Sequence, residues 1–158
     1  MALEIERKFL VADPSWRASA GPGEDYVQGY VVSDARCSLR VRIAGERAWL
    51  TLKGPTRGAV RDEFEYAIPI ADARAVLDRL CDVGRIVKTR HRVEHAGRTW
   101  EVDVFAGAHA GLVLAELELE SEDAGFERPP WLGAEVTHDA RYFNGQLARA
   151  PGVPDAPR

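Results

Sequence analysis

The chain has 158 residues and a formal net charge of −4, and 46% of its residues are hydrophobic and 29% charged. A chain of this length fits one domain that buries about two-thirds of its unfolded surface. The acidic balance argues against a general nucleic-acid binder, and no apolar run approaches the ~20 residues that a membrane span needs.

Eight segments alternate with period two, which predicts β-strands. In chain order they cover residues 3–11, 26–32, 37–43, 48–53, 60–68, 86–94, 98–105 and 112–120. Helical spacing occurs at 71–83 and 139–149. Since no β-α-β rhythm occurs, the sheet should be antiparallel and the fold mainly β, or α+β with few helices. We expect a single domain over residues 1–150 and a disordered tail over 151–158.

Charged side chains occupy alternate positions on most of the predicted strands. Because residues i and i+2 of a strand point the same way, each set lies on one face. Basic and acidic residues are largely segregated onto different strands. The sets are Glu4/Glu6/Lys8, Arg40/Arg42, Lys53, Arg61/Glu63/Glu65, Lys88/Arg90/Arg92, Glu101/Asp103 and Glu116/Glu118/Glu120.

Two interpretations of these faces compete. Charges at alternate positions of one strand are usually the solvated face of a half-buried sheet. Here, however, uncharged polar residues are scarce on the charged faces, and like charges lie side by side, where they repel. The opposite faces are also apolar enough to need cover. A closed eight-stranded barrel with its charges inside accounts for all three features.

The two kinds of charge indicate one class of ligand. Paired carboxylates are hard oxygen ligands that suit Mg²⁺ or Mn²⁺. Clustered arginine and lysine side chains match phosphate oxygens. A ligand that needs both is a polyanion carrying a divalent cation, such as a linear polyphosphate or a nucleoside triphosphate. Its hydrolysis requires positioning, charge neutralisation and an activated water more than covalent help from the protein.

The segment Glu4-Ile5-Glu6-Arg7-Lys8 has the form ExExK, and it resembles the motif that opens the CYTH domain of the triphosphate tunnel metalloenzyme superfamily. Further segments match in order: Gln28-Gly29-Tyr30, Leu39-Arg40-Val41-Arg42, Thr51-Leu52-Lys53, Glu63-Phe64-Glu65, Lys88-Thr89-Arg90, Glu101-Val102-Asp103 and Glu116-Leu117-Glu118. Val136-Thr137, Arg141-Tyr142 and Asn144 resemble the closing helix of the short bacterial members. The resemblance covers residues 1–149.

This resemblance implies an eight-stranded tunnel that hydrolyses inorganic tripolyphosphate or related triphosphates with Mg²⁺ or Mn²⁺. The residues that match the main metal ligands are Glu4, Glu6, Glu116 and Glu118. Those that match the phosphate-binding set are Lys8, Arg40, Arg42, Lys53, Lys88 and Arg90. Catalytic roles fall to Lys88 and to three carboxylates expected near a second metal or the attacking water: Glu63, Glu65 and Asp103. Arg61, Arg92 and Glu120 are expected nearer the tunnel mouth or rim.

Other functions remain open at this stage. Within the same fold, a class IV-type adenylate cyclase would need a pocket for adenine and ribose, and a thiamine triphosphatase would need an aromatic clamp. From a different class, a polyphosphate- or nucleotide-binding module with little turnover could use the same lining. The paired carboxylates favour catalysis, because a pure polyanion binder would gain affinity by losing them.

The remaining sequence features concern location and partners. Charges from Glu4 to Lys8 fall where a signal peptide would be apolar, and the two cysteines have no CxxC spacing. We therefore expect a cytoplasmic protein whose partner is a small-molecule triphosphate, without nucleic acid or membrane, and with a homodimer as an open alternative. His109 and His138 are expected to be solvated in loops.

Overall fold

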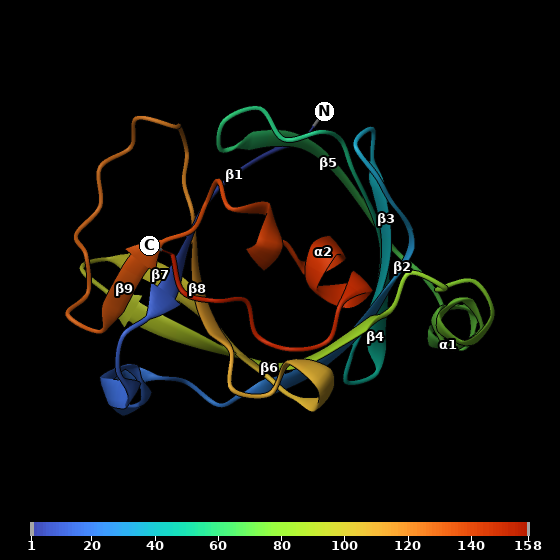
Figure 1. Cartoon of the computed structure of the whole chain (residues 1–158), viewed down its shortest axis with the longest axis horizontal. Coiled ribbons are helices and arrows are strands. Elements are labelled where there is room, and N and C mark those ends of the chain that lie inside the picture. Colours follow the sequence, from blue (N-terminus) through green and yellow to red (C-terminus); the bar gives the residue numbers. More distant parts are fainter. Residues whose placement is uncertain (1, 158) are drawn as a thin grey trace.

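The computed structural model describes residues 2–157, and strands dominate it (Figure 1). The strands are β1 (Ala2–Val11), β2 (Glu24–Ser33), β3 (Ser38–Ala44), β4 (Arg47–Lys53), β5 (Val60–Ala67), β6 (Arg85–His95), β7 (Arg98–Phe105), β8 (Val113–Glu118) and β9 (Leu132–Glu135). The helices are the 3₁₀ turns η1 (Pro14–Ser19), η2 (Gly107–His109) and η3 (Ala140–Tyr142), and the α-helices α1 (Ile70–Arg79) and α2 (Asn144–Arg149).

The predicted closed antiparallel barrel of eight strands is confirmed, with β9 as an extra strand. The strand order is β5-β4-β3-β2-β6-β7-β8-β1-β9, and pairing of β5 with β1 closes the ring. One edge of β1 pairs with β8 from Glu6 to Leu10. The other edge is shared, because β5 pairs with the start of β1 and β9 with its end, from Phe9 to Val11. Closure removes the exposed edges that an open sheet would leave.

The helices differ in part from the sequence-based expectation. The first ends at Arg79 rather than at residue 83. The second, expected over residues 139–149, divides into the 3₁₀ turn η3 and the short helix α2, with Phe143 in an extended conformation between them. The structure also contains η1, η2 and β9, which no sequence pattern predicted. Each is six residues or fewer, too short to show a period of its own.

A tight turn between β6 and β7 fixes the register of these strands. Ala96 and Gly97 both have positive φ angles, of 49° and 76°. This is the backbone of a two-residue hairpin turn whose twist matches that of the strands. The pairing that follows places Arg92 opposite Glu101 and Arg90 opposite Asp103. Charges of opposite sign from the two strands therefore meet inside the barrel.

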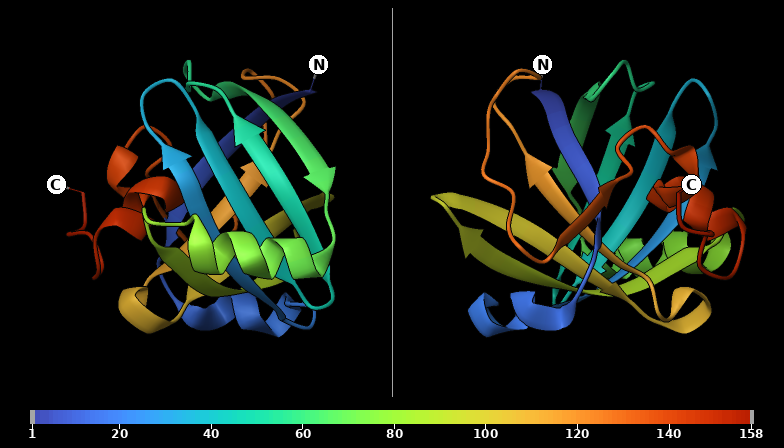
Figure 2. Two further views of the ribbon diagram at one scale, coloured as in Figure 1. Left: turned by 90° about the vertical axis from the view of Figure 1, so that its right-hand side faces the viewer. Right: turned by 60° about the vertical axis from the view of Figure 1, so that its left-hand side comes forward.

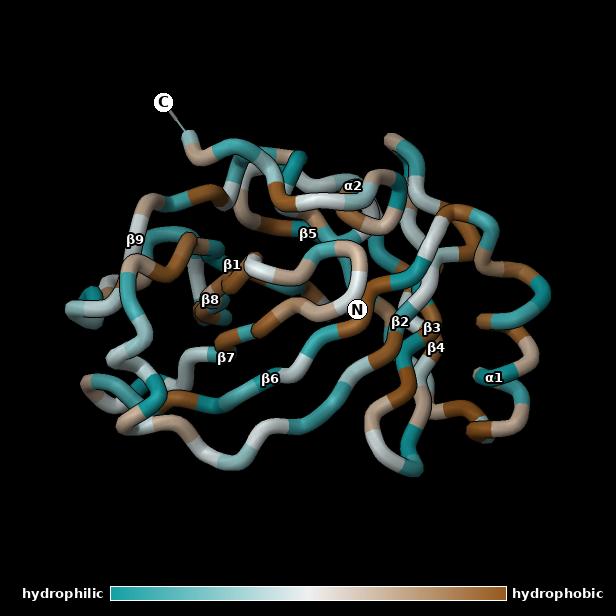
Figure 3. The backbone as a smooth tube through the Cα atoms, turned by 60° about the horizontal axis from the view of Figure 1, so that its bottom comes forward, coloured by the Kyte–Doolittle hydropathy of each residue, from teal (hydrophilic) through white to brown (hydrophobic). Residues whose placement is uncertain are grey.

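Apolar faces point outward from the barrel and are covered in different ways. Hydropathy alternates along the strands accordingly (Figure 3). One cluster packs Phe9, Trp16 and Trp100 together with Trp131. On the other side, α1 lies across the outside of the sheet and places Leu77 in the cluster around Val41 (Figure 2). These two hydrophobic clusters thus lie outside the barrel wall, which leaves most of the interior to polar groups.

One end of the interior is apolar and filled by the C-terminal segment. Ile86, Phe105 and Leu114 share strand faces with the charged Lys88, Asp103 and Glu116, but lie nearer that end of the barrel. They pack against Tyr142 and Leu147 of the closing segment, and α2 lies within the ring of strands in Figure 1.

His109 belongs to the same region and corrects the prediction that it is solvated. It is 2% exposed, and its Nε2 lies 2.6 Å from the carbonyl oxygen of Leu147 and 2.9 Å from that of Ala150. His138 is exposed, as predicted. The tail beyond Ala150 also touches the barrel, since Gly152 N donates to Ala108 O. The domain boundary and the disorder of the tail stay predictions. Among residues 2–157, no helix is both long and apolar enough to cross a membrane.

Candidate active site

The barrel encloses a cavity of about 790 Å³. Every charged residue singled out in the sequence as a metal, phosphate or catalytic candidate lines it, except Asp103. The strand parity therefore places these side chains together, although they come from six of the strands. The lining candidates are Glu4, Glu6, Lys8, Arg40, Arg42, Lys53, Glu63, Glu65, Lys88, Arg90, Glu116 and Glu118.

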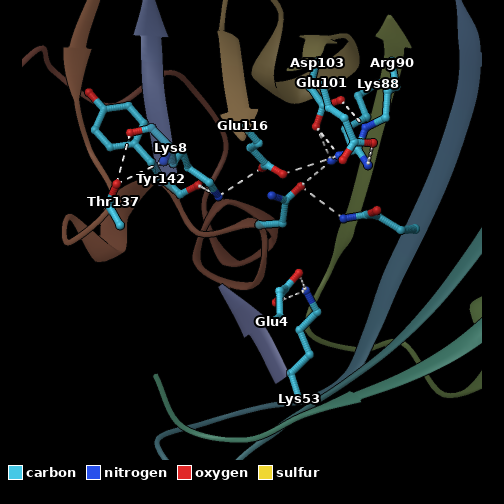
Figure 4. Close-up of polar contacts among 12 residues, drawn as sticks. Glu4, Lys8, Lys53, Lys88, Arg90, Glu101, Asp103, Glu116, Thr137 and Tyr142 are labelled. Carbon is cyan, nitrogen blue, oxygen red and sulfur yellow. Dashed lines mark hydrogen bonds and ion pairs between the residues drawn. The ribbon is translucent and has the colours of Figure 1, made fainter. Parts of the chain in front are cut away.

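Asp103 lies behind the lining rather than in it. Its carboxylate is fully buried and holds two cations that face the cavity (Figure 4). Lys88 Nζ donates to its Oδ2 at 2.6 Å, and Arg90 donates to Oδ1 and Oδ2 at 2.7 and 2.8 Å. Its hydrogen bonds in the described part of the chain all come from these two cations, so Asp103 is placed to orient Lys88 and Arg90. The expectation that it lies near the attacking water stays a prediction.

Burial lowers the pKa of Lys88 to about 7, although the Asp103 carboxylate opposes this shift. Arg90 shows the opposite balance. Burial alone would lower its pKa, but the carboxylates of Asp103 and Glu116 raise it well above the usual value. The two neighbouring cations therefore differ, since Lys88 titrates near neutral pH and Arg90 stays charged.

Two of the predicted metal ligands are paired with cations here. Glu4 accepts from Lys53 at 2.9 Å and from Arg61 at 2.8 Å, and these cations overcome burial to bring its pKa to about 2. Glu116 lies 3.4 Å from Lys8 Nζ and 3.6 Å from Arg90. The negative charge of each of these two carboxylates is therefore neutralised by nearby cations.

The other two predicted ligands, Glu6 and Glu118, lie opposite each other in the β1–β8 pairing. Within residues 2–157 neither forms a salt bridge. Burial, Glu116 and Glu4 raise the pKa of Glu6 to about 8, and burial followed by Glu4 and Glu101 raises that of Glu118. This concentration of hard oxygen donors fits a divalent cation. Within residues 2–157 no group of three or more His, Cys, Asp or Glu side chains is arranged to hold a metal ion. Glu4 and Glu116 would therefore have to break their salt bridges before they could join Glu6 and Glu118 as ligands.

The basic side of the cavity has donors in position for an anion. Arg40 is 7% exposed, and its Nε is buried without a hydrogen-bond partner among the described residues. Arg42 and Arg90 lie over the ring of Tyr26, with guanidinium carbons 4.7 and 5.2 Å from its centroid. Orphaned buried donors are costly. A phosphate oxygen would satisfy Arg40.

Two further carboxylates lie on β5. Glu63 Oε2 is 3.0 Å from Lys53 Nζ, and Glu65 accepts from Thr51 at 2.8 Å and lies 3.5 Å from Arg40. The Glu65 side chain is 40% exposed. Glu65 is thus exposed, as is Glu118 on β8, whereas Glu63 is half-buried.

Sequence reasoning did not identify every functional contact. Gln28 is fully buried and accepts from Arg42 Nε at 2.9 Å. Asn144 Oδ1 accepts from Lys88 Nζ at 3.1 Å. Both lie in segments noted for their family resemblance, but an uncharged amide gave no charge pattern to follow. Gln28 could have been predicted from strand parity, because it shares a strand face with Tyr26 and Tyr30, which are both buried.

The rim residues divide between two openings. Arg61 lines the large cavity and holds Glu4, so it lies deeper than expected. Arg92 lines a second hollow of about 440 Å³, to which Glu101 and Glu118 also contribute. Glu101 and Glu118 line both this hollow and the 790 Å³ cavity, so the two spaces adjoin, and the second one extends toward the tip of the β6–β7 hairpin. Glu120 is exposed and pairs with Arg98, as a rim position predicts.

Comparison with known proteins agrees with this geometry. Residues 2–149 match the family model of the CYTH domain, so the chain belongs to the CYTH domain family. Proteins of this kind are triphosphate tunnel metalloenzymes, a class that implies a bound divalent metal ion.

Individual relatives cover almost the whole chain. An inorganic triphosphatase of Acetivibrio thermocellus is 44% identical over 151 residues, which span 96% of each protein. An inorganic triphosphatase of Nitrosomonas europaea is 41% identical over 150 residues, which span 92% of this chain and 96% of that protein. Among solved structures, the inorganic triphosphatase NE1496 is 37% identical with a TM-score of 0.67, over 96% of this chain and 98% of that one.

Proposed function

We propose that this protein is a metal-dependent hydrolase of linear triphosphates and that its substrate is inorganic tripolyphosphate. Its relatives at 44% and 41% identity are both named inorganic triphosphatases. The observation that carries the proposal is the division of one cavity between an unneutralised carboxylate pair, Glu6 and Glu118, and a set of buried cations. A metal-chelated polyphosphate is the ligand that satisfies both.

The carboxylates would hold the metal ion. Glu6 and Glu118 are the first ligands on this proposal, with Glu4 and Glu116 completing the shell once their cations turn to the phosphates. Mg²⁺ or Mn²⁺ is the proposed ion, because both prefer carboxylate oxygens. When bound, it supplies charge neutralisation and polarisation of the phosphoryl oxygens.

The cations would bind the phosphate chain. Arg40, with its unpartnered Nε, and Arg42 contribute guanidinium groups that can contact phosphate oxygens in pairs. Lys88 and Arg90 are held in place by Asp103. Lys8 and Lys53 would exchange a carboxylate for a phosphate when the metal enters. The phosphate-binding residues on this proposal are thus Lys8, Arg40, Arg42, Lys53, Lys88 and Arg90.

The chemical step is an attack of water on the terminal phosphorus of the substrate. The bridging P–O bond breaks, and tripolyphosphate yields pyrophosphate and orthophosphate. We assign orientation of the water and acceptance of its proton to Glu63 or Glu65, the two β5 carboxylates that line the cavity outside the four proposed metal ligands. Lys88 stabilises the negative charge that develops on the phosphates. Asp103 acts through Lys88 and Arg90.

Phosphate release from tripolyphosphate, ATP and thiamine triphosphate, each with Mg²⁺, Mn²⁺ or EDTA, tests this function. Preferred release of orthophosphate from tripolyphosphate supports it. Pyrophosphate release from ATP would identify a class IV-type adenylate cyclase, and preference for thiamine triphosphate a thiamine triphosphatase. Tight tripolyphosphate binding without turnover would leave a binding module.

The location and assembly belong to the same proposal. We propose that the protein acts in the cytoplasm on a free small molecule, with neither nucleic acid nor a membrane as partner. A homodimer stays an alternative to the monomer. Light scattering during size-exclusion chromatography distinguishes the two by mass.

A further inference from the structure

The segment that covers the apolar end of the tunnel reaches the phosphate-binding cations through one side chain. Asn144 begins α2 and lines the cavity. Its Oδ1 accepts from Lys88 Nζ and from Gln28 Nε2, both at 3.1 Å. On either side of it, Tyr142 and Leu147 are buried in the apolar end. The backbone that carries Asn144 is therefore anchored to the barrel.

Gln28 extends this contact to a second cation. Its side chain is fully buried, its Oε1 accepts from Arg42 Nε at 2.9 Å, and its Nε2 also donates to Tyr30 at 3.3 Å. The amide has one allowed orientation, because a flip would set its NH₂ against the N–H of Arg42 and its oxygen against Asn144 Oδ1. The direction of the Arg42 guanidinium thus depends on Gln28, and that of Gln28 on Asn144.

Both cations keep donors for a ligand. An ammonium has three donors, and Lys88 uses two of them on Asp103 and Asn144. A guanidinium has five, and within residues 2–157 the side-chain hydrogen bond of Arg42 uses only Nε. Because both residues line the cavity, the bonds to Asn144 and Gln28 determine where their remaining donors point.

We propose that Asn144 is a positioning residue for the substrate phosphates: it fixes Lys88 directly and Arg42 through Gln28, so that affinity for the triphosphate depends on the covering segment. This inference deepens the proposed function and rests on it. Asn144 takes no part in bond cleavage, so its removal should raise KM and leave kcat nearly unchanged.

Asn144→Ala tests the proposal, because it removes both acceptor bonds and keeps the backbone. A hydrogen bond to a charged group contributes more free energy than one between neutral groups. We therefore expect KM for tripolyphosphate to rise about tenfold or more and kcat to stay within about threefold. Gln146→Ala is the matched control, since Gln146 lies on the same helix, lines the cavity and is exposed. Its kinetic constants should equal those of the wild type.

A second variant separates positioning from folding. Gln28→Met keeps the volume of the side chain and removes the link to Arg42. If Asn144 acts through Gln28, the double variant raises KM less than the product of the two single effects. Fully multiplicative effects would overturn the link from Asn144 to Arg42. A lower melting temperature of Asn144→Ala with unchanged KM would overturn the positioning role as a whole.

Calorimetric binding of tripolyphosphate in EDTA distinguishes this inference from the function on which it rests. If the wild type binds but does not hydrolyse tripolyphosphate, and Asn144→Ala weakens binding tenfold, the positioning role stands and the hydrolase proposal fails. If the wild type hydrolyses it and Asn144→Ala has the same Kd and KM, the hydrolase proposal stands and the positioning role fails. No binding by the wild type would overturn the inference.

Discussion

Glu6 lies directly opposite Glu118 in the pairing of β1 with β8, and within residues 2–157 neither carboxylate forms a salt bridge. Glu4 and Glu116, close by in the same cavity, are each neutralised by two cations. Like charges placed opposite each other on paired strands destabilise a sheet. A divalent cation bound between Glu6 and Glu118 would remove this repulsion, which accounts for the presence of the pair inside the barrel.

Replacing Glu6 with Gln should therefore have opposite effects on stability and on metal binding. The pKa of Glu6 is raised to about 8, so at pH 7 folding requires this carboxyl to take up a proton, which costs stability; the metal-free variant should therefore gain on the order of 1 kcal/mol. The same variant should lose at least tenfold in Mn²⁺ affinity. Thermal unfolding in EDTA and calorimetric titration with Mn²⁺ measure the two effects.

Glu120→Gln is the control for this experiment, because Glu120 is exposed on the rim and pairs with Arg98. It should bind Mn²⁺ as the wild type does. Wild-type Mn²⁺ affinity in Glu6→Gln would contradict the assignment of Glu6 as a ligand.

Asp103→Asn should weaken both stability and substrate binding. Asp103 is the fully buried counter-ion of Lys88 and Arg90, and removing one partner of a buried ion pair costs about 3–5 kcal/mol. Loss of the orienting charge should also raise KM. Urea denaturation and steady-state kinetics check the two. A loss of kcat at unchanged stability and KM would instead restore Asp103 as a group that acts on the water.

The pKa of Lys88, near 7, predicts a pH dependence of substrate binding. Below pH 7 the ammonium is charged and attracts phosphate. Above it the amine becomes neutral, so affinity for metal-free tripolyphosphate should fall by up to tenfold per pH unit between pH 7 and 9. Tripolyphosphate also changes its own protonation over this pH range, and this contribution to the affinity is the same for every variant. Lys88→Arg corrects for it, since a guanidinium stays charged over this range.

In Lys88→Arg the decline in affinity above pH 7 should be smaller than in the wild type. Parallel pH profiles for the two proteins would show that Lys88 does not titrate in this range or does not contact the phosphates.

Gly29→Ala tests whether the outer face of the barrel is separate from the chemistry. A methyl group there would lie 2.7 Å from Leu77 Cδ2 and 2.9 Å from Cys81 Sγ, so these side chains must move away from the barrel wall. Overpacking of this kind costs about 1–3 kcal/mol. We expect a lower melting temperature with KM and kcat near wild type. Gly125→Ala, with open space around it, should change neither. A large kinetic effect of Gly29→Ala would show that the wall transmits strain to the cavity.

The strand faces could be predicted from sequence because charge and period coincide. Glu4, Glu6 and Lys8 alternate with apolar neighbours, and the same parity brings them into one cavity. Which carboxylates are already neutralised could not be predicted, because Lys53 and Arg61 meet Glu4 only when the barrel closes.

The closing of one tunnel end was harder to read from the sequence. The faces that carry Lys88, Asp103 and Glu116 turn apolar at Ile86, Phe105 and Leu114, which is a signal that an apolar segment covers that end. The burial of His109 depends on carbonyl groups 38 and 41 residues away, at Leu147 and Ala150. No local pattern encodes such a contact, so the sequence predicts a solvated loop histidine.

Orthophosphate release from tripolyphosphate tests the central claim most directly. It would be measured with Mg²⁺ or Mn²⁺, with EDTA, and with a Glu6→Gln/Glu118→Gln double variant whose folding is checked by circular dichroism. We predict release by the wild type that requires the metal and that falls at least about a hundredfold in the double variant. Metal-independent release, or full activity of the folded double variant, would contradict the account of this cavity as a metal-dependent triphosphatase site.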